Sequence, residues 1–228
     1  MPSLVGSEMC IRDSLNAAGT ASITTSDVDN GSSDACGISS LSLDVSSYTC
    51  SNVGANTVTL TATDANNNAS TATAIVTVID STRPTASAQN ITVYLDGSGN
   101  ATITAASVDN GSADNCGTTT LSLDISSFTC SEVGANTVTL TATDANNNAS
   151  TATAIVTVID STRPTASAQN ITVYLDGSGN ATITAASVDN GSADNCGTTT
   201  LSIDISSFTC ANVGANTVTL TATDANNN

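Results

Sequence analysis

Apolar and polar residues alternate along several short segments of this chain. In the segment 137–143, TVTLTAT, the apolar residues Val138, Leu140 and Ala142 alternate with four threonines. Successive side chains of a β-strand point to opposite faces, so the three apolar residues share one face and the threonines share the other. The pattern predicts a half-buried strand in an antiparallel sheet.

The same alternation predicts four more strands around this one. Their inward residues are Ile91, Val93 and Leu95; Ile103 and Ala105; Leu121 and Leu123; and Ala152, Ala154, Val156 and Val158. No window combines a helical period of apolar residues with capping signals, and the abundant Thr and Val favour strands. Six or seven short strands in a segment of about 80 residues predict a β-sandwich.

The whole pattern recurs with a period of about 80 residues. VDNGSSDAC at 28–36 returns as VDNGSADNC at 108–116 and again at 188–196. The segments 81–148 and 161–228 differ only at Leu123/Ile203, Ser131/Ala211 and Glu132/Asn212. A period of this length is the size of a small domain rather than of one solenoid turn.

We therefore predict an all-β chain of three tandem β-sandwiches with antiparallel sheets. Repeat 1 comprises 15–80 and lacks its first strand, repeat 2 comprises 84–160 and is complete, and repeat 3 comprises 164–228 and lacks its last strand. Since the copy stops at Asn228, before a second ASTATAIVTVID, we expect a fragment of a longer protein.

The first 14 residues match no other part of the chain. Their last seven, EMCIRDS at 8–14, resemble the translation of a transposon end that is used as a sequencing adapter. We leave the segment out of the fold prediction, as a sequence of artificial origin is left out. A signal peptide is the other explanation, but Leu4 and Val5 begin no apolar run of the required length.

The chain is strongly acidic. It has 20 Asp and Glu against three Lys and Arg, no His, and a net charge of −17. Such a surface disfavours nucleic acids and anionic membranes, so we expect neither partner and no membrane insertion of this fragment. Copies this similar cannot divide catalytic roles, and without His no Ser/His or Cys/His nucleophile can be assembled. We expect no enzyme.

The cysteines recur in pairs at a constant spacing. With Cys10 set aside among the first 14 residues, the pairs are Cys36/Cys50, Cys116/Cys130 and Cys196/Cys210. The even number predicts one disulfide within each repeat, and the alternatives are a metal site or a reactive thiol. Closing a loop of about 15 residues stabilises a domain by about 3 kcal/mol. Oxidised cysteines indicate an extracellular or cell-surface location.

Two loops rich in Asp and Asn, 109–115 and 144–148, are expected at the same end of repeat 2 as the linker 80–84. Carboxylate and amide oxygens are the ligands that Ca²⁺ prefers. We predict one calcium site formed by Asp80, Asp109, Asp114, Asp144 and Asn146, and its copy formed by Asp160, Asp189, Asp194, Asp224 and Asn226. The alternative is that these residues only form turns and keep the array soluble.

Whole strands and loops of 15–228 resemble the hyalin-repeat and immunoglobulin-like modules found in tandem arrays of secreted bacterial surface proteins. The likeness is carried by QNITVYLDGSGNATITAASVDNGSADNC, VGANTVTLTATDANNN, TATAIVTVID and Pro84. It implies immunoglobulin-like sandwiches in a spacer or adhesion array. The implied partners are neighbouring repeats and surface glycans or proteins. The alternatives are a carbohydrate-binding adhesin module, which would need exposed aromatic rings, and a spacer within a larger secreted enzyme.

Overall fold

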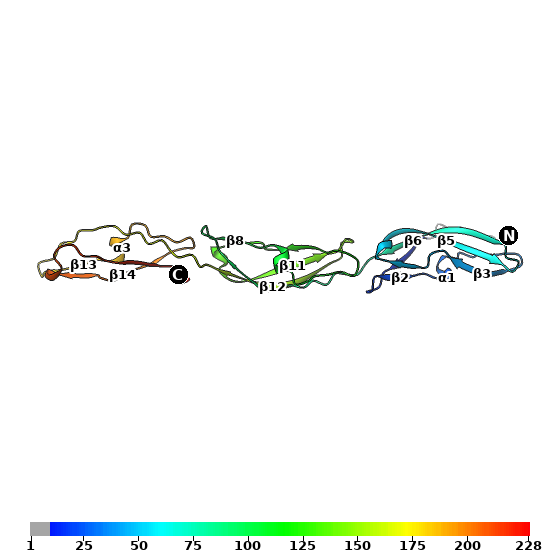
Figure 1. Cartoon of the computed structure of the whole chain (residues 1–228), viewed down its shortest axis with the longest axis horizontal. Helices are drawn as coiled ribbons and strands as arrows, with labels where there is room; N and C mark the ends of the chain where they lie inside the picture. Colours follow the sequence, from blue (N-terminus) through cyan, green and yellow to red (C-terminus); the bar gives the residue numbers. More distant parts are fainter. Residues whose placement is uncertain (1–9) are drawn as a thin grey trace. The chain divides into compact units, whose positions relative to one another are not determined.

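The computed structural model describes residues 10–228 (Figure 1). Residues 1–9, most of the adapter-like segment, lie outside the described part. The described chain consists mainly of strands and loops, which confirms the all-β prediction. It divides into two compact units: the residues up to Ala88 with Asp109–Ser122 and Leu140–Ala152, and Gln89–Val108 with Leu123–Thr139 and Thr153–Asn228. The division runs through repeat 2, so each junction between repeats lies inside one unit.

Repeat 1 is a sandwich of a four-stranded and a two-stranded sheet. Its elements are β1 (Cys10–Ser14), β2 (Thr20–Ser22), α1 (Thr25–Val28), β3 (Ile38–Leu43), β4 (Ser47–Thr49), the 3₁₀ turn η1 (Cys50–Asn52), β5 (Gly54–Asp64) and β6 (Ala69–Ile79). The larger sheet has the order β1-β6-β5-β3, and the smaller one pairs β2 with β4. Tyr48, Val58, Leu60, Val76 and Val78 form the centre of its buried core.

Repeat 2 follows the same plan. Its elements are β7 (Ile91–Tyr94), β8 (Asn100–Thr102), α2 (Ala105–Val108), β9 (Thr120–Leu123), β10 (Ser127–Thr129), η2 (Cys130–Glu132), β11 (Gly134–Thr143) and β12 (Ala149–Ile159). The sheets have the orders β7-β12-β11-β9 and β10-β8. Val138, Leu140, Ala142, Val156 and Val158 are at most 1% exposed, so their predicted inward direction is confirmed.

The first strand of each larger sheet runs parallel to the last strand, which corrects the prediction of purely antiparallel sheets. In β7 and β12, Ile91 lies opposite Val156 and Val93 lies opposite Val158. Alternation determines which face a residue takes but not the direction of the strand, so the pattern could not show this pairing.

Residues Cys10–Ser14 occupy this position in repeat 1, where the alignment of the repeats provides no first strand. They pair parallel with β6, and Ile11 packs against the core. The pairing needs only backbone groups and one inward apolar side chain, so it carries no information about the origin of the segment.

A helical turn stands where Ala105 was expected to continue a strand. Ser107 Oγ donates a hydrogen bond to Thr104 O at 2.7 Å, and Thr104 N donates to Ser107 Oγ at 3.3 Å. Side-chain bonds of Ser and Thr to the nearby backbone compete with sheet pairing. The turn directs Val108 into the core, where it is fully buried.

Repeat 3 keeps the smaller sheet but has a reduced larger one. Its elements are β13 (Asn180–Thr182), α3 (Ala185–Val188), β14 (Thr200–Ile203), β15 (Ser207–Thr209), η3 (Cys210–Asn212) and β16 (Leu220–Thr223). β13 pairs with β15, and β14 pairs only with β16. The segment 171–174, the counterpart of β7, forms no strand. The buried core comprises Ile183, Val188 and Phe208.

Candidate functional site at the junctions between repeats

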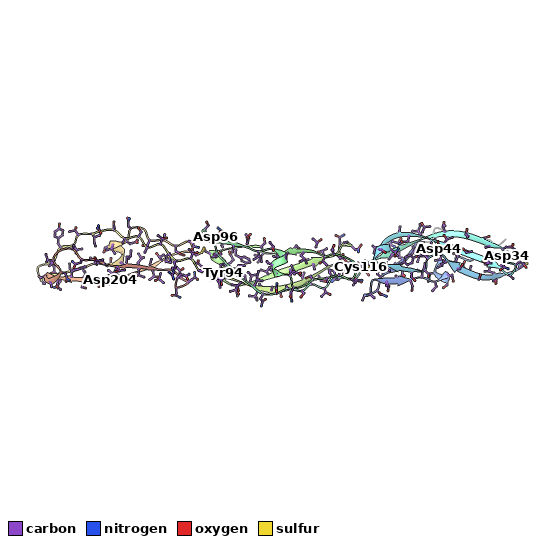
Figure 2. All side chains as sticks on the ribbon, in the orientation of Figure 1. Asp34, Asp44, Tyr94, Asp96, Cys116 and Asp204 are labelled. Carbon is purple, nitrogen blue, oxygen red and sulfur yellow. A yellow bond between two sulfur atoms is a disulfide. The ribbon has the colours of Figure 1, made fainter. Side chains whose placement is uncertain are left out.

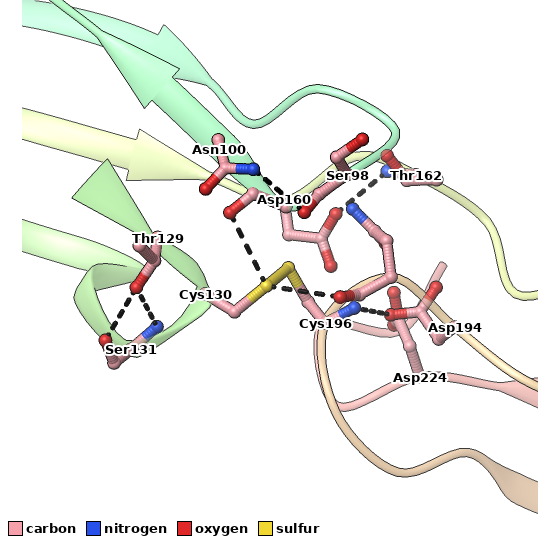
Figure 3. Close-up of a disulfide and its surroundings, with 12 residues drawn as sticks. Ser98, Asn100, Thr129, Cys130, Ser131, Asp160, Thr162, Asp194, Cys196 and Asp224 are labelled. Carbon is pink, nitrogen blue, oxygen red and sulfur yellow. Dashed lines mark hydrogen bonds between the residues drawn. A yellow bond between two sulfur atoms is a disulfide. The ribbon is translucent and has the colours of Figure 1, made fainter. Parts of the chain in front are cut away.

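Disulfide bonds join successive repeats rather than closing single ones. Cys50 of repeat 1 is bonded to Cys116 of repeat 2, which Figure 2 labels, and Cys130 of repeat 2 is bonded to Cys196 of repeat 3 (Figure 3). The predicted pairs Cys36/Cys50, Cys116/Cys130 and Cys196/Cys210 are therefore wrong. Cys36 and Cys210 are exposed and not disulfide-bonded.

Strand length explains the correction. In repeat 1, Cys36 precedes β3, whose Ile38 lies opposite Asp64 at one end of β5, whereas Cys50 precedes Gly54 at the other end. A strand the length of β5 rises by about 35 Å at roughly 3.3 Å per residue, and a disulfide requires Cα atoms within about 7 Å. The two cysteines of one repeat are too far apart to bond.

A glycine makes room for the bonded sulfur at each junction. Gly99 has a φ of +75°, and a Cβ built on it would lie 2.5 Å from Cys130 Sγ and 3.2 Å from Asn195 O. Gly19 holds the same place beside Cys50, at 2.6 Å. Both the left-handed backbone and the close approach require glycine.

Three carboxylates meet beside the first disulfide. Asp80, at the end of repeat 1, and Asp114 and Asp144, of repeat 2, each place one oxygen within 4.8 Å of the others. Asp80 is 4% exposed and Asp144 is 5% exposed. Asn146 Nδ2 donates to Asp80 Oδ2 at 3.1 Å. Four of the five residues predicted for this site are thus brought together.

The copy of this cluster lies at the second junction. Asp160, Asp194 and Asp224 satisfy the same 4.8 Å criterion, and Asn226 Nδ2 donates to Asp160 Oδ2 at 3.1 Å. Figure 3 shows Asp194 and Asp224 next to each other beside Cys196.

Asp114 links the acidic cluster to the disulfide. Its Oδ2 accepts a hydrogen bond from Cys116 N at 2.8 Å. Its Oδ1 is buried and accepts no hydrogen bond in the part of the chain that the structure describes. An unsatisfied buried acceptor costs about 1–3 kcal/mol, and more when it is charged. A cation in contact with this oxygen would remove that cost.

Asp144 is ionised at neutral pH although it is buried. Burial raises its pKa, but hydrogen bonds from Asn148 Nδ2, Asn148 N and Asn146 N outweigh this effect and hold the pKa below the ordinary 3.8. The three bonds are 2.7–2.8 Å long. Asp144 therefore forms the turn and also contributes a negative charge to the cluster, so the two explanations of the acidic loops both apply to it.

Asp109 and Asp189 do not belong to either group of carboxylates. Asp109 Oδ1 accepts from Ser112 N at 2.9 Å and its Oδ2 accepts from Gly111 N at 3.2 Å. Asp189 makes the same two bonds in repeat 3. Hydrogen bonds from the side chains of Ser112 and Ser192, followed by these backbone bonds, hold the pKa of the Asp109 and Asp189 carboxyls below 3.8. At these two positions the turn-forming explanation accounts for the aspartate.

Asn148 is a junction residue that the sequence pattern did not predict. Its Nδ2 lies 3.1 Å from Asp80 O and donates to it across the junction, as Asn228 does to Asp160 O. The available signal was its position four residues after Asp144, at the end of the same acidic loop. In repeat 1 the corresponding aspartate, Asp64, makes the same turn, but it belongs to no group of three carboxylates among residues 10–228.

No protein-family model matches this chain, and no curated protein matches it. Three solved structures have partial similarity to this chain. Protocadherin gamma B7 extracellular cadherin domains 1–4 are 16% identical, with 89% of this chain and 62% of that chain covered and a TM-score of 0.36. Sidekick-1 immunoglobulin domains 1–4 are 11% identical (73% of this chain, 54% of that chain, TM-score 0.24), and the fibronectin(III)-like modules of Clostridium thermocellum CbhA are 15% identical (70% of this chain, 95% of that chain, TM-score 0.25). The chain spans 62% of the protocadherin structure. Across residues 10–228, no helix is long and apolar enough to cross a membrane.

Proposed function

We propose that the chain is a non-catalytic extracellular array of immunoglobulin-like repeats that spaces or displays other domains and adheres through weak, multivalent contacts. The observation that carries this proposal is the bonding of Cys50 to Cys116 and of Cys130 to Cys196. Bonds placed across junctions stabilise the connection between repeats. Bonds placed inside repeats would serve only the folding of each one.

The disulfides also support the extracellular location. Disulfides persist in oxidising compartments and are rare where thiols are kept reduced. The near identity of the repeats supports a role without catalysis, because such copies offer the same surface many times. Repetition increases avidity without any new contact.

Calcium at the junctions is the second part of the proposal. The side chains at the first cluster offer only oxygen ligands, which suit Ca²⁺, whereas Zn²⁺ prefers Cys and His. Asp80, Asp114 and Asp144 would hold the ion, which supplies positive charge among three carboxylates. Because Asp80 belongs to repeat 1 and the other two to repeat 2, the ion would restrict motion at the junction.

Thermal unfolding with and without Ca²⁺ tests this part. Extracellular sites bind with Kd values of about 0.1–1 mM, so about 10 mM Ca²⁺ stabilises the folded state by roughly 2 kcal/mol per site. That corresponds to a rise in Tm of several degrees. Replacing Asp144→Asn and Asp224→Asn together should abolish the rise.

Asp64→Asn is the matched control, because Asp64 forms the same turn without the other two carboxylates. It should leave the calcium response unchanged. If isothermal titration gave no saturable heat up to about 10 mM Ca²⁺, the calcium part of the proposal would be contradicted. An equal loss of response in the control would also contradict the assigned site.

Peptide mapping of the oxidised, unreduced protein tests the junction bonds. Mass spectrometry should find Cys50 linked to Cys116 and Cys130 linked to Cys196. A disulfide between Cys36 and Cys50 would contradict the proposal that disulfides join successive repeats. X-ray scattering should then show a narrower distribution of interatomic distances in the oxidised protein with Ca²⁺ than in the reduced protein with a chelator.

Glycan binding is the second candidate, and the exposure of Tyr94 favours it. The side chain is 62% exposed, and its counterpart Tyr174 is 88% exposed (Figure 2 labels Tyr94). Exposed aromatic rings stack on sugars, but repeats 2 and 3 each offer a single exposed ring, and the aligned position before repeat 1 is Ser14. A glycan array probed with the wild type and with the double variant Tyr94→Ala, Tyr174→Ala tests this candidate. Binding that survives the double variant would exclude the tyrosines as the contact.

A further inference from the structure

The first junction disulfide, between Cys50 and Cys116, is accessible enough for a small thiol to reach it. Both cysteines are only half-buried. A thiolate reduces a disulfide by attacking one sulfur and expelling the other. Burial alone therefore does not protect this bond, and the charges around its two sulfurs decide which thiols reduce it.

The surroundings of Cys116 are negatively charged. Asp114 Oδ2 accepts a hydrogen bond from Cys116 N at 2.8 Å, so the carboxylate lies a few ångströms from the sulfur of the same cysteine. Asp80 and Asp144 each place an oxygen within 4.8 Å of an oxygen of Asp114. A like charge disfavours the ionised form of a neighbouring group, so a sulfur anion at Cys116 is unfavourable.

The surroundings of Cys50 carry partial negative charge. Its Sγ lies 3.4 Å from Asn115 O and 3.7 Å from Gly19 O. Oriented backbone groups act as fixed partial charges, so these oxygens repel an incoming thiolate. Attack on Cys50 also expels the Cys116 thiolate beside Asp114, and a thiol whose pKa is raised leaves more slowly. Attack on either sulfur is therefore opposed by negative charge.

The second junction disulfide, between Cys130 and Cys196, has the same surroundings. Cys130 Sγ lies 3.4 Å from Asn195 O and 3.8 Å from Gly99 O. Cys196 N donates to Asp194 Oδ2 at 2.8 Å. The negative surroundings are thus a recurring property of the junctions.

We propose that the two junction disulfides select among reductants by charge: they resist thiols of net negative charge and are reduced by thiols that carry a balancing positive charge. At about 4–8 Å in water, each pair of like charges slows approach by roughly 2- to 6-fold, so three carboxylates together slow an anionic thiolate about ten-fold or more. This selectivity goes beyond the spacer role proposed above, and it requires the carboxylates but no calcium.

The reduction consumes two thiols of the reductant. The first thiolate attacks Cys50 Sγ, forms a mixed disulfide and expels the Cys116 thiolate. The second thiolate attacks the reductant's sulfur in the mixed disulfide and releases Cys50. One protein disulfide is reduced, two small thiols are oxidised to one small disulfide, and the protons of these two thiols end on Cys50 and Cys116. Repulsion acts on the first step, when the reductant enters the junction.

The experiment measures how fast each junction disulfide of the full chain is reduced, with a chelator present to remove Ca²⁺. The reductants are glutathione, which has a net negative charge, and cysteamine, whose ammonium group balances the charge of its thiolate. Timed samples are alkylated and mapped by mass spectrometry, and rates per thiolate are divided by those on a small uncharged disulfide. Cysteamine should then be about ten-fold or more faster than glutathione, and added salt should narrow the difference. Equal corrected rates would overturn the proposal.

Asp114→Asn separates charge from structure. Asparagine keeps an oxygen that can accept the hydrogen bond from Cys116 N, but it removes the charge. The preference for cysteamine should fall by roughly 2- to 6-fold at the first junction disulfide. It should stay unchanged at the second junction disulfide, which is the control within the same sample, and in Asp109→Asn, which lies in the same loop but outside the acidic cluster. An unchanged preference, or equal acceleration of both reductants by a looser junction, would overturn the proposal.

Discussion

Repeats 2 and 3 have nearly the same sequence but different structures. They differ at three positions over 68 aligned residues, 81–148 and 161–228. Yet Ile91–Tyr94 forms β7, whereas 171–174 forms no strand. Val138 is fully buried, but its counterpart Val218 is only half-buried. The difference between the repeats therefore comes from what packs beside these residues.

The strand β12 accounts for the difference. It lies between β7 and β11 in repeat 2, whereas residues 164–228, which form repeat 3 here, contain no copy of its sequence ASTATAIVTVI. In repeat 3 a groove of about 730 Å³ lies between the counterparts of β7 and β11, and its apolar lining includes Ile171, Val173, Leu175, Phe208 and Val218. Identical residues thus form a strand only where a neighbour completes their hydrogen bonds and covers their apolar faces.

The largest expected effect comes from supplying the strand. A chain extended after Asn228 by ASTATAIVTVID should fill the groove of repeat 3 with two valines, each contributing about 1.5–3 kcal/mol on burial. Amide exchange at Val218 and Leu220 should then slow by roughly 100-fold or more, because about 1.4 kcal/mol corresponds to a factor of ten.

An extension with Asp in place of both valines is the control, because it has the same length but cannot be buried. Unchanged exchange with the valine extension would contradict the role assigned to β12.

A smaller difference in the free energy of unfolding is expected between the variants Gly99→Ala and Gly179→Ala. Both substitutions place a side chain at a positive φ, which costs about 1–2 kcal/mol. Only Gly99 faces a bonded sulfur, so its substitution should also reduce formation of the Cys130–Cys196 bond, which contributes roughly 2–4 kcal/mol. Denaturant unfolding and the fraction of bonded Cys130 measure the two effects. Equal losses in both variants would show that backbone strain alone matters.

Val138→Ala and Val218→Ala compare the cores directly. Val138 is 0% exposed, so losing two methyl groups and leaving a cavity should cost about 2–3 kcal/mol. Val218 lines the open groove, where the same change should cost about 1 kcal/mol or less. Local opening free energies from amide exchange provide the measurement. A larger loss of local opening free energy in Val218→Ala than in Val138→Ala would contradict the assignment of the better-packed core to repeat 2.

The smallest expected effect is a pH dependence that the two repeats share. Thr139 N donates to Asp124 Oδ1 at 2.7 Å, and Thr219 N donates to Asp204 Oδ1 at 2.8 Å. These bonds hold the pKa of both carboxyls below 3.8. The stabilisation is therefore complete above the unfolded pKa and is lost as the pH falls through the lower folded pKa.

Carboxyl titration by NMR should give similar pKa values for Asp124 and Asp204, both below 3.8. Asp124→Asn should remove the pH dependence of stability around Thr139 and leave the pH dependence around Thr219 unchanged. A raised pKa at either aspartate would contradict the hydrogen bonds.

Much of the fold could be predicted because alternation reports which face of a strand is buried. Val138, Leu140 and Ala142 follow from that rule alone. The rule carries no direction, so the parallel pairing of β7 with β12 was missed. It also carries no information about hydrogen bonds between side chains and the nearby backbone, so it predicts a strand where the turn that begins at Ala105 lies.

The cysteine pairing could not be read from the spacing. In exact repeats, a constant separation within a repeat implies a constant separation between neighbours, and the observed bonds join residues 66 apart. Spacing therefore fits Cys36/Cys50 and Cys50/Cys116 equally well. The length of β5 separates the two patterns, and that length becomes visible only once the strand is placed in its sheet.

The acidic cluster was largely predictable because strands that run up and down bring their loops to common ends. Asp80, Asp114 and Asp144 meet as expected. Asp109 does not, because its carboxylate is used within its own turn by Ser112 and Gly111. Sequence position places a residue in a loop, but local hydrogen bonds decide where its side chain points.

The disulfides also determine how the chain carries tension. Residues 51–115 and 131–195 lie inside loops closed by the bonds from Cys50 to Cys116 and from Cys130 to Cys196. A pull on the two ends passes through the sulfurs and bypasses both loops, even if the repeats unfold. About 130 residues, roughly 440 Å at about 3.4 Å each, are thereby withheld from extension until the bonds are reduced. The redox state of two bonds thus sets the maximum length to which this chain can be drawn.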